Sequence, residues 1–392
     1  MLALVMALAL VACGQQKEPD VQEPQGPTGT DEVTYKVAMI TDYGDITDQS
    51  FNQTTYEACK AFAEANGVDF QYFKPAGDNT ADRVAMIESA IDQGYNVIVM
   101  PGYAFGAAIA ETAPKFEDVK FIALDVPAGD LGEGFVVPAN LYCAVYQEEL
   151  CGYMAGYAAV KLGYKNLGFL GGMAVPAVQR YGYGFVQGVD AAAAELELTD
   201  VKLNYAYGNQ FFGDADITAA MDTWYAGGTE VVFACGGGIY TSAVDAAKKV
   251  EGAKVIGVDV DQAGVIANYA AGEGADAATV EGYKALTVTS AMKGLYPATY
   301  DTLTDVIVNG NWEKYSAKID TLGLVSADDP AANYVQIPME STQWADGAFT
   351  QDDYKALVKA MFDGTLTVSN DTTKAASDFA TVITVEDLGN IK

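Results

Sequence analysis

Histidine is absent from this chain, and basic residues are scarce. The 392 residues include 22 Lys and Arg against 53 Asp and Glu, which gives a formal net charge of −31. Without histidine, zinc sites of the usual type and Ser-His or Cys-His catalysis are excluded. The negative charge disfavours nucleic acid and anionic lipid headgroups as partners, but it does not repel a small molecule that carries no phosphate.

Cysteine is also rare, and its spacing matches no known site. The five cysteines show no CxxC or Cys/His pattern, so we expect no metal site and no cofactor. Cys143 and Cys151 could form a disulfide outside the cell or remain buried free thiols. The sequence leaves these two alternatives open.

Long apolar runs are missing as well. The run at residues 1–12 is shorter than the about 20 residues that span a bilayer as a helix, and it is typical of a signal peptide. It ends in LVACG, which resembles a bacterial lipobox. We therefore expect residues 1–13 to be a lipoprotein signal peptide with its lipobox. Cys13 would carry lipid, including palmitate, and would anchor the protein on the extracytoplasmic face of the cell membrane. The usual basic start is missing, and the alternative is an apolar N-terminus with a chance cysteine.

Residues 14–33 are rich in Gln, Pro, Gly and acidic residues. Such a segment cannot bury enough apolar surface to offset the entropy lost on ordering. We expect it to be a flexible tether between the membrane and the folded part of the chain.

From residue 36 onward, short apolar runs alternate with longer helical stretches. The first series contains the runs KVAMITD, FQYFKP, VIVMPG and FIALDVP, and a second series after residue 146 ends with VIGVDVDQ. Near-continuous apolar strands separated by helices of about 10–15 residues indicate parallel sheets covered on both faces. The chain is therefore predicted to be an α/β protein with two lobes, each a doubly wound, mostly parallel sheet.

The lobes are expected to divide the chain as follows. The first lobe comprises residues 34–142 and the second residues 143–265, while residues 266–392 supply hinge crossings and C-terminal elements. A helix is predicted over residues 285–307, and part of 270–330 is expected to return to the first lobe. Because ligands of open α/β sheets bind beyond the carboxyl ends of the strands, two facing sheets create a cleft there.

The first strand leads into the segment DYGDITDQSFN at residues 42–52. Asp42 could accept hydrogen bonds from amide or hydroxyl groups of a ligand. Ser50 could cap the following helix, and Phe51 would point into the space above the sheet. On these residues alone, a capped turn with a core phenylalanine is the stronger interpretation.

Three glycines, Gly236, Gly237 and Gly238, close the run VVFACGGG ahead of a helix. A helix N-terminus attracts anions, but the chain has no GxGxxG or GxxxxGK[ST] motif and its charge disfavours phosphate. We expect the glycines, Gly237 in particular, to let the backbone approach a ligand.

Five segments match one known family in the same order. These are DYGDITDQSFN, FLGGMAVPAVQRYGYGFVQG, YGNQFFGD, VIGVDVDQ and VTSAMKG. Together they resemble the basic membrane protein family of substrate-binding lipoproteins, from about Lys36 to Lys293. The resemblance implies a type I periplasmic-binding-protein-like fold with a ligand cleft between the lobes. It also implies an ABC importer, with separate permease and ATPase subunits, as the partner.

The family's purine nucleoside receptors hold the base between two aromatic rings. By motif, the resemblance implies that Phe51 and Phe212 are these rings, with Phe211 a near alternative to Phe212. Stacking of this kind is tolerant of base identity. The simpler alternative is that Phe211 and Phe212 pack together in a loop.

The same resemblance implies carboxylates and a lysine around the ligand. Asp42 would bind the edge of the base, whereas Asp125 and Asp259 would bind ribose hydroxyls, with Asp261 competing for the role of Asp259. Helix N-capping is the alternative for each acid. The complete set of expected ligand contacts is Asp42, Phe51, Asn52, Asp125, Phe212, Gly237, Asp259 and Lys293.

Several functions compete at this point. The leading hypothesis is a monomeric receptor that captures a purine nucleoside by lobe closure and catalyses no reaction. A binding protein for a sugar or a vitamin such as riboflavin is the alternative within the same class. A nucleoside hydrolase-type enzyme that uses Asp42 or Asp259 as acid or base, and an adhesin with a degenerate cleft, are the remaining ones.

Overall fold

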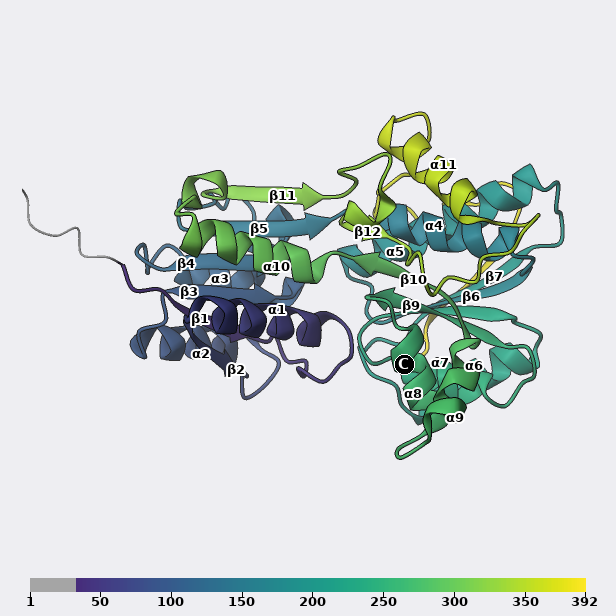
Figure 1. The fold of residues 1–392 in the computed structure, drawn as a ribbon, viewed down its shortest axis with the longest axis horizontal. Helices are drawn as coiled ribbons and strands as arrows, with labels where there is room; N and C mark the ends of the chain where they lie inside the picture. Colours follow the sequence, from purple (N-terminus) through teal and green to yellow (C-terminus); the bar gives the residue numbers. More distant parts are fainter. Residues whose placement is uncertain (1–32) are drawn as a thin grey trace, which may run out of the picture. The chain divides into compact units, whose positions relative to one another are not determined.

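The computed structural model describes residues 33–392. The predicted lipobox with Cys13 and all but the last residue of the predicted tether lie outside the described residues. Tyr35–Lys392 forms one compact unit that contains a six-stranded and a seven-stranded sheet (Figure 1). Among the described residues, no helix combines the length and apolar character needed to cross a bilayer.

The first sheet has the strand order β11-β5-β4-β3-β1-β2, and all of its strands are parallel. Helices α1 and α10 cover one face, whereas α2 and α3 cover the other. The strands are β1 (Lys36–Ile40), β2 (Asp69–Phe73), β3 (Val97–Pro101), β4 (Lys120–Leu124), β5 (Leu141–Tyr146) and β11 (Lys318–Leu322), and the helices are α1 (Phe51–Asn66), α2 (Thr80–Asp92), α3 (Gly106–Thr112) and α10 (Leu295–Leu303). Along β1, Val37 and Met39 pack on one face and Ala38 and Ile40 on the other, so both faces are apolar.

The second sheet has the order β12-β10-β9-β8-β6-β7-β13, and only β12 is antiparallel to its neighbour. Helices α4 and α5 cover one face, and α6, α7 and α8 cover the other. The strands are β6 (Asn166–Gly171), β7 (Lys202–Tyr207), β8 (Val231–Cys235), β9 (Lys254–Asp259), β10 (Thr287–Lys293), β12 (Val335–Gln336) and β13 (Thr384–Asn390). The helices are α4 (Glu148–Lys161), α5 (Pro176–Glu195), α6 (Ala215–Ala226), α7 (Tyr240–Ala247), α8 (Ala263–Ala271), α9 (Ala277–Lys284) and α11 (Gln351–Phe362), with short 3₁₀ or π turns at Tyr103–Phe105, Ala128–Leu131, Thr304–Val308, Trp312–Lys314, Pro330–Ala332 and Ala376–Phe379.

The predicted α/β fold with two doubly wound sheets is confirmed, but one predicted helix is wrong. The segment expected to be helical over 285–307 forms strand β10 first and helix α10 only from Leu295. Its first half, TVTSAMK, is rich in β-branched residues and almost completely buried in the sheet, where it pairs with β9. Burial within the sheet therefore decides its conformation.

The two lobes are joined by three chain crossings. The chain passes between the sheets after Tyr146, after Lys293 and between Leu322 and Val335. The predicted boundary at residue 142 falls inside β5, whose pairing with β4 and β11 places residues up to Tyr146 in the first sheet. The return to the first lobe consists of α10, which packs on α1, and β11.

Backbone hydrogen bonds tie these crossings together. The amide of Gln147 donates to the carbonyl of Leu322 at 3.0 Å, and the amide of Gly294 donates to the carbonyl of Tyr334 at 2.6 Å. The amide of Tyr334 donates in turn to Gly323 at 3.0 Å. The three connecting segments are therefore hydrogen-bonded to one another.

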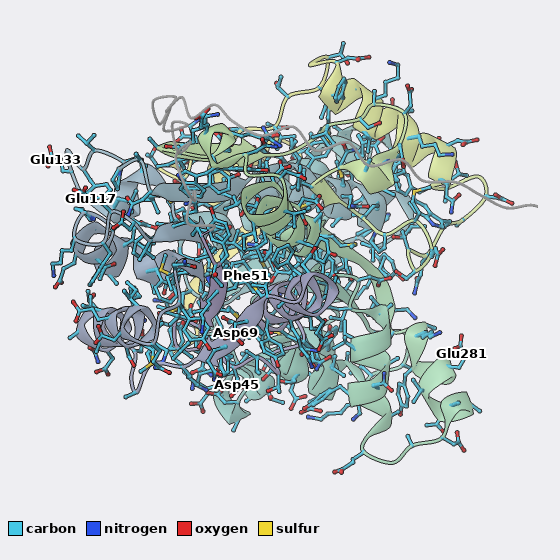
Figure 2. All side chains as sticks on the ribbon, turned by 60° about the vertical axis from the view of Figure 1, so that its left-hand side comes forward. Asp45, Phe51, Asp69, Glu117, Glu133 and Glu281 are labelled. Atoms are coloured by element: carbon cyan, nitrogen blue, oxygen red, sulfur yellow. The ribbon has the colours of Figure 1, made fainter. Side chains whose placement is uncertain are left out.

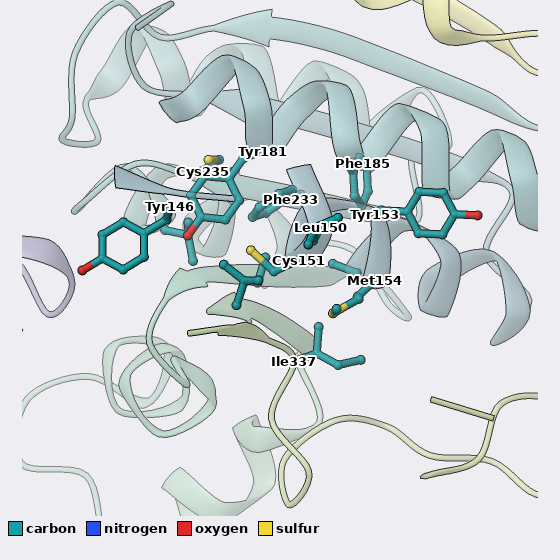
Figure 3. Packing of buried hydrophobic residues seen from close by; sticks show 14 of the residues in the cluster. Tyr146, Leu150, Cys151, Tyr153, Met154, Tyr181, Phe185, Phe233, Cys235 and Ile337 are labelled. Carbon is teal, nitrogen blue, oxygen red and sulfur yellow. The ribbon is translucent and has the colours of Figure 1, made fainter. Parts of the chain in front are cut away.

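Helices α4 and α5 cross at unusually close range. A side chain at Gly152 or Gly156 of α4 would overlap backbone of α5, and one at Gly184 or Gly188 of α5 would overlap backbone of α4. Around this crossing Met154 and Phe185 join Tyr146, Tyr181 and Phe233 in a large apolar cluster (Figure 3). The close approach fixes the relative position of α4 and α5, which carry Glu148 and Arg180.

The four described cysteines are buried free thiols. Of the two alternatives for Cys143 and Cys151, the structure therefore has the unpaired one, with Cys143 in β5 and Cys151 in α4.

Replacement of Gly184 by alanine is expected to loosen the α4–α5 crossing. The added methyl group would overlap the backbone of Glu149, so the free energy of unfolding should fall by about 1–3 kcal/mol, as for other overpacked cores. Urea unfolding measures the change. The matched control is Gly264→Ala in α8, where a methyl group meets nothing, and there stability should stay the same or rise by up to about 1 kcal/mol. Equal behaviour of the two variants would contradict this account.

Candidate functional site

A cavity of about 400 Å³ lies between the two sheets. This volume is within the range of small-molecule sites. From the first lobe it is lined by residues at the ends of β1, β3 and β4 and at the start of α1, and from the second lobe by the loop after β7, the ends of β8, β9 and β10, and α5. All eight residues that the sequence predicted as ligand contacts line it, namely Asp42, Phe51, Asn52, Asp125, Phe212, Gly237, Asp259 and Lys293.

Asp42 closes the turn that follows β1. Its Oδ1 accepts the backbone amides of Tyr43 at 2.7 Å and Gly44 at 2.9 Å. The other oxygen faces Gly102, where a Cβ atom would lie only 2.7 Å from it. Burial raises the pKa of Asp42, and the two amides oppose that shift without cancelling it. Asp42 therefore offers one acceptor oxygen to the cavity from a turn that is already fixed.

Ser50 does not cap helix α1 with its side chain, contrary to the sequence prediction. Asp48 accepts the amides of Ser50, Asn52 and Gln53 at 2.9–3.0 Å instead, because two residues farther upstream the carboxylate can reach the first turn. The Ser50 hydroxyl donates to Oδ2 of Asp259 at 2.6 Å. A hydroxyl of the first lobe thus contacts a carboxylate of the second.

Lys293 is the central charge of the site. Its ammonium group is buried and lies 2.5 Å from Asp125, 3.6 Å from Asp259 and 3.7 Å from Glu148. Burial alone would lower its pKa, but the three carboxylates outweigh this and raise it, so Lys293 stays protonated. Its ammonium also lies 4.7 Å from the centre of the Phe51 ring, a cation–π distance.

Asp125 and Asp259 end their strands in the same unusual way. Both have positive φ values, 58° and 64°, which non-glycine residues adopt rarely and aspartate more readily than most. Both carboxylates lie within ion-pair distance of Lys293. One oxygen of Asp125 is buried without a hydrogen-bond partner among the described residues. An unpaired buried acceptor of this kind is costly unless a ligand donates to it.

Asp261, the alternative to Asp259, has another role. It is exposed and accepts the amide of Ala263 at 3.1 Å at the start of α8. Asp259 lines the cavity and accepts the hydroxyls of Ser50 and Tyr181. Asp261 therefore lies outside the cavity lining, and the carboxylate at the cavity is that of Asp259.

A second ion pair lies below Lys293. Arg180 of α5 donates to Glu148 of α4 at 2.7 Å, and Glu148 is completely buried. Burial raises the pKa of Glu148, and the Arg180 charge opposes the shift. One Glu148 oxygen has no hydrogen-bond partner within the described part of the chain. The chain contains only two arginines, and the other, Arg83, donates to the carbonyl of Asp42 at 3.2 Å.

The aromatic residues at the cavity differ in exposure. Phe51 is half-buried beside Lys293, and Phe211 packs against Gly172 and Gly236, where a side chain would collide with its ring. Phe212 is 57% exposed although it lines the cavity. Both rings therefore line the cavity, with Phe211 half-buried against the two glycines and Phe212 the more exposed of the two.

Gly237 lies directly under the Phe211–Phe212 segment. It has a positive φ of 49°, and a side chain there would press on the carbonyl of Phe211. The amide of Gly238 donates to that carbonyl at 2.8 Å. The glycine run therefore lets two loops of the second lobe approach closely at the cavity wall.

The cavity is acidic overall. Six aspartates line it, Asp42, Asp45, Asp48, Asp125, Asp130 and Asp259, against three cations, Lys74, Arg180 and Lys293. Each of these cations lies within 3.0 Å of a carboxylate. Other carboxylates are spread over the surface, such as Glu133 and Glu281 at the edges of Figure 2, whereas Phe51 lies at its centre. The site therefore favours a ligand that donates hydrogen bonds and disfavours a phosphate.

Several residues of the site escaped the sequence analysis. Glu148 resembles an ordinary acidic residue in the first turn of a helix, and Tyr181 resembles a core tyrosine. Asp130 belongs to a loop with no motif, although its Oδ2 is buried without a partner among the described residues. The scarcity of arginine could have pointed to the site, because both arginines of the chain contact groups at the cavity.

Comparison with known proteins identifies the family. Residues 35–334 match the family described as "ABC transporter substrate-binding protein PnrA-like". The chain is 27% identical to "ABC transporter nucleoside-binding protein BmpA" of Lactococcus lactis over 270 residues, which cover 66% of this chain and 73% of the relative. It is 26% identical to "Basic membrane protein B" of Borreliella burgdorferi over 297 residues, covering 74% and 78%.

Solved structures agree in fold. A solute-binding protein of an ABC transporter system from Aeropyrum pernix superposes with a TM-score of 0.64 at 20% identity, covering 88% of this chain and 90% of the other. One from Conexibacter woesei gives a TM-score of 0.59 at 22% identity, covering 86% and 99%. The two-lobed fold of solute-binding proteins is therefore confirmed.

Glu149, next to Glu148, is expected to make stability depend on pH. It is 2% exposed, and burial together with the charge of Glu148 raises its pKa from 4.5 to about 7. Between these values the native state binds more protons than the unfolded chain, so the free energy of unfolding falls as pH rises through this window. Glu149→Gln should reduce the fall by about 3 kcal/mol.

Urea unfolding between pH 4.5 and 7.5 measures this effect. The control is Glu64→Gln, an exposed position on α1, which should keep the wild-type dependence. If Glu149→Gln also keeps it, the Glu149 carboxyl is not the titrating group.

Proposed function

The chain belongs to the PnrA-like family of ABC transporter substrate-binding proteins, and we propose that it captures a purine nucleoside, or a similar heterocyclic riboside, in the cavity between its lobes. The observation that carries the proposal is the buried lysine–carboxylate cluster placed beside aromatic rings from both lobes. Such a site offers polar groups for sugar hydroxyls and flat apolar faces for a base.

The sugar would be bound at the Lys293 cluster. The free oxygen of Asp125 and the carboxylate of Asp259 accept hydrogen bonds from hydroxyl groups, and Lys293 donates one. Hydrogen bonds to charged groups contribute about 1.5–3 kcal/mol each, more than neutral ones. A hydroxyl that reaches Asp259 would take over the contact that Ser50 makes with it.

The base would lie between Phe51 and Phe212. Phe51 comes from the first lobe and Phe212 from the second, so a flat ligand between them links the lobes. Asp42 and Asn52 lie at the same end of the cavity as Phe51 and would bind the edge of the base; the Oδ1 of Asn52 is buried without a partner among the described residues. Stacking would supply affinity, and the polar edge contacts would supply selectivity.

Lobe closure would follow from this arrangement. A ligand that contacts both lobes binds the closed state more tightly than the open one, and this difference in affinity shifts the population toward closure. The three crossings provide the hinge. No reaction follows, and the closed, loaded protein would deliver the ligand to the permease of an ATP-driven importer.

The remaining parts of the proposal rest on sequence. We propose that Cys13 carries a lipid that anchors the protein on the extracytoplasmic face of the cell membrane, and that the protein acts as a monomer. The names of the relatives, a nucleoside-binding protein and basic membrane proteins, support both the ligand class and the membrane association.

Thermal unfolding with a panel of ligands tests the proposal. The protein from residue 34 onward is refolded from denaturant to remove bound ligand, then heated with guanosine, inosine, adenosine, cytidine, guanosine monophosphate, ribose or riboflavin. A purine nucleoside at about 100 times its Kd should stabilise the fold by about 2.7 kcal/mol. The monophosphate should give a smaller effect. A shift with ribose or riboflavin alone would overturn the ligand class, and release of free base would identify an enzyme.

Phe212→Ala is expected to weaken nucleoside binding about 5- to 150-fold, because stacking on a base contributes about 1–3 kcal/mol. The melting temperature of the ligand-free protein should barely change, since the ring is largely exposed. Titration calorimetry measures the affinity. Phe362→Ala on α11 is the matched control, because that ring is 45% exposed and does not line the cavity. Equal affinities of the two variants would exclude stacking on Phe212.

A further inference from the structure

Residues 335–392 lie beyond the part of the chain that matches the family and wrap around the second lobe. We call this segment the C-terminal strap. It begins with β12, which pairs with β10, continues with α11 against α4, and ends with β13 beside β7. Figure 1 shows its yellow elements lying against the second lobe.

The middle of the strap is fixed to helix α5. Asp190 accepts the amides of Thr381 and Val382 at 2.7 and 2.8 Å and the Thr381 hydroxyl at 2.6 Å. Gln187, one turn earlier, exchanges hydrogen bonds of 2.9 Å with the backbone of Ser369. Charge-assisted hydrogen bonds to a buried carboxylate such as Asp190 are among the stronger ones. The strap therefore has a defined path up to β13.

Strand β13 carries the strap to the loop that bears Phe212. It runs parallel to β7 from Thr384 to Asn390, and the amide of Ile391 donates to the carbonyl of Tyr207 at 2.8 Å. Tyr207 is the last residue of β7, so the loop at residues 208–214 begins where this pairing ends. The strap thus reaches the start of the loop that carries Phe212.

Lys392 joins the strap to the loop through side chains. Its ammonium group contacts the carboxylate of Asp214 and lies 3.3 Å from Oε1 of Gln210. The side-chain amide nitrogen of Gln210, Nε2, donates to the carboxylate of Asp214 at 2.9 Å and to the backbone carbonyl of Phe212 at 2.8 Å. Lys392 is therefore connected to the backbone of Phe212 through one side chain.

Asp214 is in turn fixed to the body of the lobe. Its Oδ1 accepts the amides of Asp216 and Ile217 at 3.0 Å and caps helix α6. Its backbone amide donates to Ser242. The Gln210 side chain thus links the Asp214 carboxylate to the backbone of Phe212. The ammonium group of Lys392 neutralises the charge of that carboxylate.

We propose that the C-terminal strap positions the ligand-binding loop, and that Lys392 is the positioning residue through which it acts on Phe212. An exposed ring has few packing contacts to hold it, so its orientation depends on the backbone beneath it. Ordering that backbone before the ligand arrives removes a cost that binding would otherwise carry. The effect on affinity rests on the function proposed above, whereas the effect on the loop does not.

Two measurements test this inference on the protein from residue 34 onward. In the absence of ligand, Lys392→Ala should increase amide hydrogen exchange within residues 208–214 and leave the rest of the second lobe unchanged. It should also weaken binding of guanosine about 3- to 10-fold, consistent with the loss of a partly exposed ion pair and of loop order. Lys392→Arg keeps the charge, so its hydrogen exchange within residues 208–214 and its affinity for guanosine should match those of the wild-type protein.

The matched control is Lys355→Ala. Lys355 lies on α11 of the same strap and pairs with Asp352 at 3.5 Å, far along the chain from the loop. This variant should change neither measurement. Gln210→Ala supplies a double-mutant cycle, because adding it to Lys392→Ala should weaken binding little further if both act along one path.

The outcomes separate the two proposals. Unchanged exchange within residues 208–214 in Lys392→Ala overturns the positioning role, whatever the affinity does. Increased exchange with an unchanged guanosine Kd overturns the link from loop order to binding. If the wild-type protein binds no nucleoside, the proposed function fails, and the exchange measurement alone still decides whether Lys392 orders the loop.

Discussion

The buried ammonium group of Lys293 is the interaction on which the site depends. It belongs to the last residue of a strand in the second lobe, yet its shortest contact is with Asp125 of the first lobe. Three carboxylates surround it, and each would be costly to bury without it. The close crossing of α4 and α5 brings Glu148 beneath it, and Asp125 and Asp259, at the ends of their strands, lie within ion-pair distance of it. The Lys293 cluster thus links the two lobes and sets the polarity of the cavity between them.

The electrostatics of the cavity decide which ligands suit it. Its lining cations are already paired with carboxylates, and several acceptor oxygens lack partners among the described residues. A ligand rich in hydroxyl and N–H donors satisfies such a surface, whereas an anion adds to its negative charge. Because these groups are buried, water competes poorly for their hydrogen bonds, and a ligand's hydrogen bonds to them are stronger than in solvent. The overall negative charge of the chain has the same sign as that of the site.

The strap shows how a segment distant in sequence can reach the loop that carries Phe212. The amides of residues 381–383 in the strap donate to Asp190 of α5, directly before β13 begins. Only through the path of β13 does Lys392 come to lie beside Asp214. No feature of the polar tail indicates such a contact, because its chain is exposed along β13 and carries no apolar periodicity.

The sequence by itself determined the α/β class, the two lobes and the residues at the ends of the apolar strands, because parallel strands buried on both faces need continuous apolar runs and their carboxyl ends meet at one edge. It did not determine the conformation of TVTSAMK or the role of Ser50. Helical and strand patterns are hard to tell apart over so short a run. The Ser50 hydroxyl is engaged by Asp259, more than 200 residues away in the chain, and Asp48 accepts the amides at the start of α1. Tertiary structure alone decided that Asp259 rather than Asp261 reaches the cavity, that Phe212 is more exposed than Phe211, and that the Arg180–Glu148 pair lies next to Lys293. Those outcomes depend on contacts between segments far apart in the chain, which local sequence does not encode.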